Sequence, residues 1–422
     1  MMQQGKSEKI CLLTNPFVSG ANLTDGLREK NIRLIAVISG EGIINEEFKK
    51  RFNSSLFDQV YNLKDNFDVV INKLKTLNII QVISDSDSGI YWADKISKEL
   101  NLENRNDFDS VEFRINKFVT NERCRESGLS ICKEIYKDNS TLSEEEENRL
   151  KSWNSNWVVK PNKGSAGGFS VTICKSIEEI KAALKNSFGL MPKLGCRTEQ
   201  LVIQEKLLGD EYFIDTFSFK GKHLATCFCQ YERKIINNSP ICLSIDTLDL
   251  NSELAKKCFI YCKNVLNATQ LSNGPAHIEL MINNKNIRLI ELNARFSGSY
   301  GLINQSAKLS YGLNQYNVLA DLILDEKKFS FYLNKEKLFK QSAKIVMLQN
   351  QVLRYIKELN LKFLMSLNSY VTCFQFKKGE YNTEAKNVFD RVGLVLLAHN
   401  QSEVIKEDYK RIREMEENNL LY

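Results

Sequence analysis

The strongest structural signal in this sequence is a pair of alternating apolar runs around an asparagine-rich turn. The runs cover residues 276–282 and 287–295, and the turn between them holds Lys285. Side chains alternate between the two faces of a strand, so two such runs around a short polar turn are typical of a β-hairpin. We therefore expect an antiparallel hairpin here.

A turn centred on Lys285 determines which residues face each other across this hairpin. Glu279 then lies opposite Glu291, and His277 lies opposite Asn293. All four side chains share one face of the hairpin. The other face carries the apolar side chains Ile278, Leu280, Ile290 and Leu292.

Two facing carboxylates on one strand pair point to a bound cation. Their Cβ atoms are expected about 4.5–5.5 Å apart, where like charges repel each other unless a cation lies between them. Mg²⁺ takes oxygen ligands, so Glu279, Glu291 and the amide oxygen of Asn293 form a candidate metal site. Arg295, two residues further on the same face, can reach a phosphate. A solvent-facing strand with ordinary charges is the alternative, although its polar face would be expected to mix signs.

A glycine-rich segment follows another predicted strand. The strand 157–161 carries Lys160 near its end, and the loop 162–169 after it holds three glycines. Glycines allow backbone N–H groups to approach phosphate oxygens. The loop lacks the Gly-Lys-Ser/Thr ending of a Walker A motif, and the strand 170–174 that follows excludes a Rossmann fingerprint. A glycine flap over a nucleotide and a plain hairpin turn both remain open.

The first hundred residues alternate between strand and helix patterns. Apolar runs at 9–13, 32–38 and 78–84 predict strands, with helices between or after them. This alternation predicts a parallel α/β sheet, whose ligand sites lie beyond the carboxyl ends of its strands. The loops near Ser19 and Asp87 lie at that edge, and ordinary turn and helix-capping roles are the alternative for either loop.

The rest of the chain predicts antiparallel strands and surface helices. Residues 212–230 and 277–295 are typical of antiparallel strands, with a helix at 254–266 between them. A charged helix is expected at 404–417, and the polar stretch 138–156 fits a solvated helix face or a surface insertion. The expected fold class is therefore α/β together with α+β.

Length and composition narrow the class of protein. A chain of 422 residues exceeds one ordinary core, so two or three domains are expected. The 11 cysteines are odd in number and lack the paired spacing of zinc fingers, which favours reduced core thiols over metal ligands.

The net charge of +6, without a dense basic block, fits anionic small molecules and argues against nucleic acid as a partner. No apolar run is long enough to span a bilayer and no secretory signal opens the sequence, so a cytoplasmic address without a membrane partner is expected.

The acidic hairpin and the glycine segment together resemble the ATP-grasp superfamily. The branch most similar to this chain contains carboxylate–amine ligases, including L-amino acid (dipeptide) ligases and carnosine synthase. The resemblance covers nearly the whole chain. It implies an N-terminal parallel α/β (pre-ATP-grasp) domain at 1–112, a lid subdomain at 113–208, and a large subdomain with antiparallel sheets and a C-terminal lobe at 209–422.

The motifs of this superfamily imply a set of site residues. Its ATP-binding positions match Lys117, Lys160, Lys163, Gly164, Ser165, Gly167, Gly168, Glu205, Lys206, Leu208 and Glu211. Its metal positions match Glu279, Glu291 and Asn293. Catalytic roles are implied for Arg295 and His277, and substrate contacts are implied for Asp87, His277 and Arg295.

Two positions depart from the family pattern. Asn116 stands where aspartate is usual, and Asp87 stands where the branch has glutamate, which keeps the charge but shortens the reach. For His277 a buried, hydrogen-bonded structural role is the alternative. The stretch 231–240 is expected to be a substrate-covering loop, with Arg233 as a further candidate.

A member of this branch is expected to form an amide or peptide bond and to release ADP. It would use ATP and Mg²⁺, with Mn²⁺ as a substitute, pass through an acyl-phosphate, and act on amino acids or related small metabolites. A homodimer is the default assembly. Two other hypotheses stay open, namely a small-molecule kinase of the same fold and an inactive nucleotide-binding module. The complete acidic face argues against the inactive module.

Overall fold

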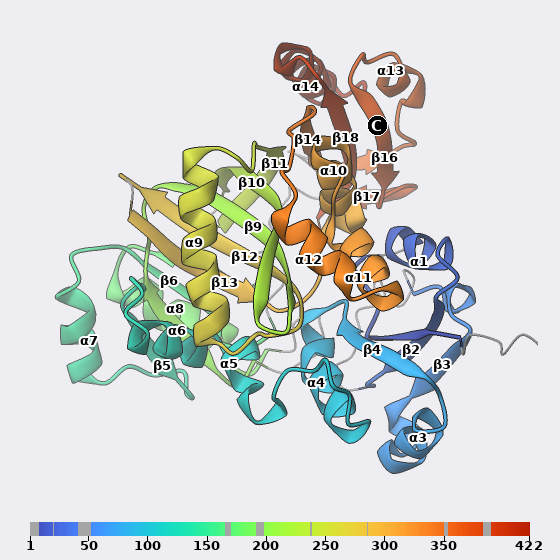
Figure 1. Ribbon diagram of the computed structural model, residues 1–422. Helices are drawn as coiled ribbons and strands as arrows, with labels where there is room; N and C mark the ends of the chain where they lie inside the picture. The colour runs from blue at the N-terminus through green and yellow to red at the C-terminus, as the bar shows by residue number, and fades with distance from the viewer. Residues whose placement is uncertain are drawn as a thin grey trace, which may run out of the picture.

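The computed structural model of the protein describes residues 8–19, 21–40, 52–164, 170–190, 198–236, 239–284, 286–349, 353–382 and 390–422. Within these ranges the chain forms three large sheets and a small two-stranded one, with helices packed on them (Figure 1). No helix in these ranges has both the length and the apolar character needed to cross a membrane.

The N-terminal sheet is parallel, as the sequence predicts. Its strands lie in the order β3 (Gln59–Asn62), β2 (Arg33–Ile38), β1 (Ile10–Thr14) and β4 (Ile79–Ser84). Helix α1 (Ala21–Arg28) packs on one face, and α3 (Phe67–Leu74) and α4 (Ile90–Glu99) pack on the other (Figure 1). Because helices cover both faces, β1 is buried at every position. The strand β3 is mostly exposed and carries no apolar pattern, so the sequence does not reveal it.

A second four-stranded sheet, the lid sheet, is antiparallel and comes from the middle of the chain. Its strands lie in the order β5 (Glu134–Lys137), β8 (Leu201–Glu205), β6 (Trp157–Pro161) and β7 (Thr172–Cys174). Its neighbouring helices in sequence are α5 (Glu112–Ile115), α6 (Lys117–Glu126), α7 (Glu144–Lys151) and α8 (Ile177–Ser187). The acidic run lies on α7, which begins with a capping box of Ser143 and Glu146, so the predicted polar helix is confirmed.

The large sheet has eight antiparallel strands. Their order is β13 (Asn286–Asn293), β12 (Gly274–Asn283), β9 (Asp210–Phe219), β10 (Lys222–Ile236), β11 (Ser239–Thr247), β14 (Ser342–Gln349), β18 (Arg391–His399) and β16 (Tyr370–Gln375). Its helices are α9 (Glu253–Ala268), α10 (Leu302–Tyr311), α11 (Gln315–Leu324) and α12 (Lys327–Asn334). Helix α9 covers β9 and β10 (Figure 1). The predicted helix between two antiparallel strand pairs is therefore confirmed.

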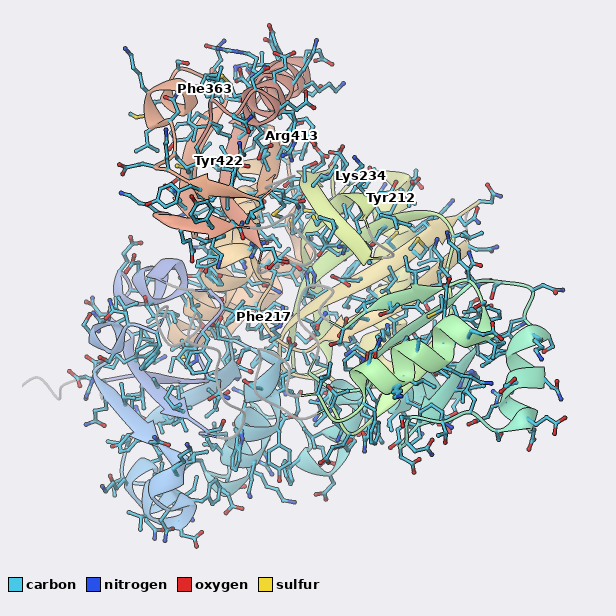
Figure 2. All side chains as sticks on the ribbon, turned by 180° about the vertical axis from the view of Figure 1, so that it is seen from behind. Tyr212, Phe217, Lys234, Phe363, Arg413 and Tyr422 are labelled. Carbon is cyan, nitrogen blue, oxygen red and sulfur yellow. The ribbon has the colours of Figure 1, made fainter. Side chains whose placement is uncertain are left out.

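The C-terminal lobe is built around the last strands of the large sheet. It also contains α13 (Leu361–Met365), α14 (Ser402–Glu417) and the small sheet of β15 (Arg354–Ile356) and β17 (Glu380–Asn382). Side chains from β14, β18 and α14 form a core of their own. Figure 2 shows Phe363, Arg413 and Tyr422 in this lobe, apart from Phe217 in the main core.

The main core joins the N-terminal sheet to the large sheet. Leu13 and Leu34 of the N-terminal sheet belong to the same apolar cluster as Phe213 and Phe217 of β9. Four cysteines of the large sheet and of α9 are fully buried in it, which confirms the predicted core positions of Cys227, Cys229, Cys258 and Cys262.

The stretch 231–240 is not the substrate-covering loop that the sequence analysis expects. Tyr231 to Ile236 continue β10, and Ser239 and Pro240 begin β11, while Asn237 and Asn238 lie outside the described residues. Residues 229–236 of β10 pair with β11, with Tyr231 opposite Ile245. This pairing uses the backbone groups of these residues, so Arg233 lies on a hydrogen-bonded strand.

Candidate active site

The predicted hairpin forms between β12 and β13. Glu279 pairs with Glu291 and His277 pairs with Asn293, so the predicted register at the polar face is confirmed. We call Glu279 and Glu291 the acidic pair. In the described part of the chain, no group of three or more His, Cys, Asp or Glu side chains is arranged to hold a metal ion. The candidate donor set therefore consists of the acidic pair and the amide of Asn293.

The hairpin contains a β-bulge that the sequence does not show. Towards the turn, Leu280 pairs with Leu289 and Asn283 pairs with Asn286, one residue off a turn centred on Lys285. A bulge at Ile290 takes up this one-residue difference and restores the pairing beyond it. Leu289 thus occupies the buried position that the prediction gives to Ile290, which is partly exposed.

Two lysines from the lid reach the hairpin beside the acidic pair. The ammonium of Lys117 lies 3.0 Å from Oε1 of Glu291. The ammonium of Lys160 donates to the backbone oxygen of Ile290 at 3.2 Å. Both lysines are buried, and the side chains of Glu279 and Glu291 are 17% and 18% exposed, so two cations and two carboxylates meet in a largely buried site.

Lys117 is held by the start of α6. Asn116 caps this helix, because its Oδ1 accepts the backbone N–H of Val119 at 3.1 Å. Asparagine and aspartate cap helices about equally well. The departure from the family pattern at Asn116 therefore leaves the local structure intact.

Each member of the acidic pair has a positive neighbour. Lys117 contacts Glu291, and Nε2 of His277 lies 3.3 Å from Oε1 of Glu279. Burial lowers the pKa of His277, but the hydrogen bonds and charges of Asp215 and Glu279 outweigh it and raise this pKa to about 9. Burial raises the pKa of Glu279, but His277, Arg233 and Tyr231 together outweigh it and lower this pKa to about 2. Lys117 and His277 therefore offset part of the repulsion between the carboxylates. A cation bound between Glu279 and Glu291 is not the only way to balance their charge.

Arg295 links the hairpin to the N-terminal sheet. Its Nε donates to Oδ1 of Asp87 at 2.9 Å, and its Nη1 donates to the backbone oxygen of Phe296 at 2.8 Å. Asp87 begins a short 3₁₀ helix just after β4. Two residues with implied substrate contacts, more than 200 positions apart in sequence, thus form one ion pair.

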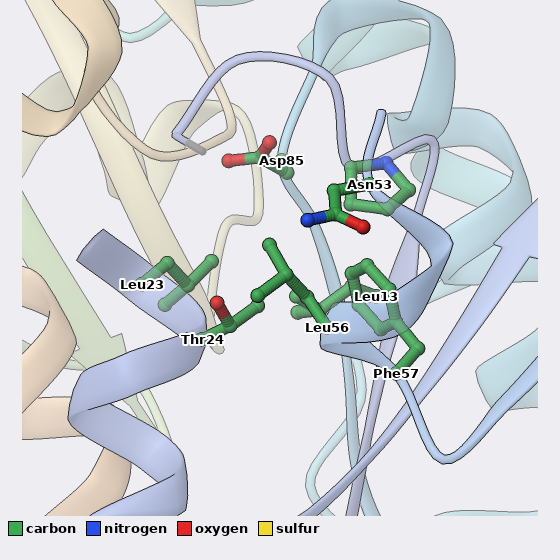
Figure 3. Close-up of a pocket in the computed structure, with 8 residues that line it drawn as sticks. Leu13, Leu23, Thr24, Asn53, Leu56, Phe57 and Asp85 are labelled. Carbon is green, nitrogen blue, oxygen red and sulfur yellow. The ribbon is translucent and has the colours of Figure 1, made fainter. Parts of the chain in front are cut away.

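Asp85, two residues before Asp87, is a buried acid that sequence reasoning did not select. Its Oδ2 accepts the backbone N–H groups of Val18 at 2.8 Å and Ser19 at 3.0 Å, which ties the loop after β1 to β4. Figure 3 shows its carboxylate at one end of a small pocket that is also lined by Leu13, Pro16, Leu23, Thr24, Asn53, Leu56 and Phe57. Burial raises the pKa of Asp85 to about 6, although the hydrogen bonds from Ser19 and Val18 and the charge of Arg295 act in the opposite direction.

The raised pKa of Asp85 predicts a pH-dependent stability. A carboxyl whose pKa rises from 3.8 to about 6 on folding favours the folded state below pH 4, and this contribution is lost as the pH rises through 6. The loss amounts to about 3 kcal/mol, since one pKa unit corresponds to about 1.4 kcal/mol. We expect the Tm of Asp85→Asn, relative to that of the parent, to increase between pH 4 and pH 7 in thermal unfolding. A relative Tm that is constant over this range would contradict the prediction.

The segment with implied adenine contacts lies at the end of β8. Glu205 is paired through Oε1 with Nη1 of Arg288 at 2.7 Å, which connects the lid sheet to β13. The backbone N–H of Lys206 donates to Asn156 at 2.8 Å, so this amide is already used within the chain. The side chain of Leu208 is 65% exposed.

Gly209 allows this segment to turn against the hairpin. Its φ is 137°, and a Cβ atom there would lie 2.1 Å from the backbone oxygen of Ile282. Only glycine fits such a close approach with this backbone conformation. The turn therefore rests directly on β12.

Glu211, with an implied ribose contact, is held by an arginine. Nε of Arg233 donates to its Oε2 at 2.6 Å, and Nη2 donates to its Oε1. The guanidinium also lies 4.3 Å from the ring centre of Tyr231. Arg233 is a candidate from the sequence analysis, which expected it in a loop. It lies instead on β10, where it contacts Glu211, a residue with an implied nucleotide contact.

The glycine segment is only partly described. Lys163 forms an ion pair with Glu112 at 2.7 Å, with both side chains exposed. Gly164 has a φ of 63°. Ser165, Gly167 and Gly168 lie outside the described residues, so the flap stays a prediction.

Two functional candidates were missed by sequence reasoning. Asp215 on β9 contacts His277, and Tyr231 on β10 contacts Glu279. Both contacts depend on the order β12–β9–β10 in the large sheet. A hairpin signal reveals only the pairing of its own two strands, so it could not have located them.

Comparisons with known proteins identify an ATP-grasp domain in part of the chain. Residues 153–302 match the family model described as an ATP-grasp domain. Dapdiamide A synthase of Enterobacter agglomerans is 21% identical over 364 residues, and the match covers 83% of this chain and 82% of that protein.

Solved structures show the same architecture. The L-amino acid ligase from Bacillus licheniformis is 17% identical, covers 97% of each chain and gives a TM-score of 0.75. Phosphoribosylglycinamide synthetase from Anaerococcus prevotii is 18% identical, with a TM-score of 0.67 over 97% of this chain and 98% of that one. At these identities the likeness establishes the fold.

Proposed function

We propose that this chain, in which residues 153–302 match an ATP-grasp domain, is an ADP-forming ligase that joins a carboxylate to an amine. One observation carries this proposal. The acidic pair of β12 and β13 meets the ammonium groups of Lys117 and Lys160, which come from the lid. Cations and carboxylates in one buried site suit the binding of a metal–triphosphate complex.

The nucleotide is proposed to lie between the lid sheet and the large sheet. Lys117 and Lys160 would neutralise its phosphates, and the end of β8 near Glu205 would meet the adenine. Glu211 would meet the ribose, with Arg233 fixing its orientation. The ion pair between Arg288 and Glu205 supports this arrangement, because it joins the two sheets beside the implied adenine site.

The donor set fits Mg²⁺, with Mn²⁺ as a substitute. Glu279, Glu291 and Asn293 offer only oxygen atoms, and Mg²⁺ prefers a few protein carboxylates together with substrate phosphates. An ion held there would neutralise charge on the transferred phosphoryl group. When ATP and the ion bind, Lys117 can exchange its contact with Glu291 for a phosphate.

The ion pair of Asp87 with Arg295 supports an amino acid as substrate. An α-amino acid carries a carboxylate and an ammonium close together, and it can take the place of each partner in this pair. Arg295 would then hold a carboxylate or the transferred phosphoryl group, and Asp87 would hold an ammonium. The names of the relatives, an L-amino acid ligase and dapdiamide A synthase, agree with substrates of this class.

The proposed chemistry needs no covalent bond to the enzyme. The substrate carboxylate attacks the γ-phosphorus of ATP and ADP leaves, which yields an acyl-phosphate. Arg295 and the lid lysines stabilise the charge on the phosphoryl group during transfer. The amine then attacks the acyl carbon, an amide bond forms, and inorganic phosphate leaves.

The remaining features of the proposal come from the sequence analysis. We propose a cytoplasmic location, a homodimer, and a division of the chain into domains at residues 112 and 208. The lid sheet and the large sheet, which do not share strands among the described residues, support the second boundary.

A small-molecule kinase is the second candidate, and the reaction products separate it from a ligase. We expect ADP release from ATP and Mg²⁺ to require two amino acids, and we expect mass spectrometry to find their condensation product, lighter than the two together by one water. Added hydroxylamine should capture the acyl-phosphate as a hydroxamate. A stable phosphorylated product formed from one substrate alone would instead identify a kinase.

A further inference from the structure

A buried row of polar side chains connects β9 to the acidic pair. Nδ1 of His277 donates to Oδ1 of Asp215 at 2.7 Å, and Nε2 of the same ring lies 3.3 Å from Oε1 of Glu279. The hydroxyl of Tyr231 donates to the same Oε1 atom at 3.0 Å and lies 3.2 Å from Nε2 of His277. Both contacts converge on Oε1, and neither uses the second carboxylate oxygen, Oε2.

The sheet itself aligns this row. Asp215 pairs with His277, and Phe213 pairs with Glu279, between β9 and β12. The ring of Phe213 lies 4.5 Å from that of His277 and 5.0 Å from that of Tyr231. Hydrogen bonds in such an apolar setting are stronger than in water. The row is therefore a rigid support for Glu279.

Asp215 is an unusual choice for a position that serves only packing. It is 1% exposed, and its Oδ2 has no hydrogen-bond partner within the described residues. A buried carboxylate oxygen without a partner costs stability, whereas an apolar residue of similar size would not. The hydrogen bond that Asp215 accepts from His277 gives a reason for keeping a carboxylate here in spite of this cost in stability.

We infer that Asp215, His277 and Tyr231 are positioning residues that hold Glu279 by Oε1 and leave Oε2 for the metal ion. The inference rests on the proposed function, because it concerns the cation of that reaction. It gives His277 a role beside the carboxylate instead of a contact with the reacting atoms. Loss of an outer contact to a metal ligand typically weakens metal binding by about 10- to 100-fold.

Replacing Tyr231 with phenylalanine tests the inference directly. The variant keeps the ring against Phe213 and removes only the hydroxyl. We expect the Kd for Mn²⁺, measured by electron paramagnetic resonance of the free ion in the presence of ADP, to rise by about tenfold. The affinity for ADP without metal, measured by calorimetry, should stay unchanged. Asp215→Asn should shift the Mn²⁺ Kd in the same direction, since it replaces the carboxylate that accepts the hydrogen bond from Nδ1 of His277 with a weaker acceptor.

Tyr311→Phe is the matched control. It also removes a buried hydroxyl, which donates to the backbone of Leu248 away from the acidic pair, and its Mn²⁺ Kd should equal that of the parent. Equal Kd values in the parent and in both Tyr231→Phe and Asp215→Asn would overturn the inference and leave the proposed function standing. A rise shared by Tyr311→Phe would overturn it as well. A parent that binds no Mn²⁺ in the presence of ADP would overturn both.

Discussion

Glu291→Gln is expected to lower kcat for ADP formation by about 10²- to 10³-fold. Glutamine keeps the shape of the side chain but removes the charge that faces Glu279 and contacts Lys117. Metal binding and the balance of charge around the phosphates both depend on that carboxylate in the proposed reaction. The measurement is a coupled assay of ADP release at saturating ATP and amino acids, repeated over a range of Mg²⁺ concentrations.

Glu232→Gln provides the control for this change. Glu232 lies on β10, accepts a hydrogen bond from Tyr409 at 2.9 Å, and makes its described contacts away from the acidic pair. Its replacement should leave kcat within about twofold of the parent, as expected for a partly exposed side chain outside the site. If Glu291→Gln and Glu232→Gln both turned over at the rate of the parent, the acidic pair would have no part in catalysis.

Arg114→Leu is expected to lower the free energy of unfolding by about 3–5 kcal/mol. Arg114 is 1% exposed. Its guanidinium donates to the carboxylate of Asp94 at 2.7 Å and to the backbone oxygens of Asp107 at 2.9 Å and Thr269 at 3.1 Å. Leucine leaves the carboxylate of Asp94 buried without its charge partner. Burial raises the pKa of Asp94 even in the parent, where Arg114 offsets part of the effect. Urea unfolding followed by circular dichroism measures the change.

Arg123→Leu is the matched control for Arg114→Leu. Arg123 lies on α6 and pairs with Glu126 at 2.5 Å, with side chains 37% and 61% exposed. Exposed ion pairs contribute about 0–1 kcal/mol, so this variant should unfold almost as the parent does. If both variants lost the same free energy of unfolding, the buried contacts of Arg114 would contribute no more to stability than an exposed ion pair does.

The acidic pair could be predicted because its signal is local. The alternation on each side of a short turn places Glu279 opposite Glu291, and hairpin geometry needs no further information. The bulge at Ile290 could not be predicted, since it depends on how the backbone closes the turn. The predicted register is right at the acidic pair only because the bulge compensates for a turn shifted by one residue.

The contacts between distant strands explain what the sequence analysis missed. Asp215 and Tyr231 lie on strands that are 62 and 46 residues away from their partner His277. Alternation shows which face of a strand is polar, but it does not show which strand lies beside it. The same limit explains the expectation of a loop at 231–240. Two asparagines, a serine and a proline follow Ile236 in the sequence, which is typical of a turn, and the sequence does not show that Ser239 and Pro240 begin a strand, β11, that pairs with β10.

The parallel N-terminal sheet could be predicted because its signal repeats along the chain, and the structure confirms it. The ATP-grasp fold, which only the family resemblance implied, is confirmed as well. Apolar runs at regular intervals predict the strands, and helices between them require parallel pairing. The ion pair between Asp87 and Arg295 could not be derived in this way. It joins the end of β4 to the end of β13, and only the packing of the two sheets brings them together.

The large sheet is continuous from the acidic pair to the C-terminal lobe. From β13 to β16 each strand is hydrogen-bonded to the next, so the strands of the lobe and the acidic pair belong to one hydrogen-bonded unit. The lid sheet shares no strand pairing with it in the described chain and touches it through side chains such as Lys160 and Glu205. In the proposed reaction, a nucleotide that enters between the two sheets therefore has to separate the charged groups that join the lid to β13, which are Lys117 with Glu291 and Glu205 with Arg288.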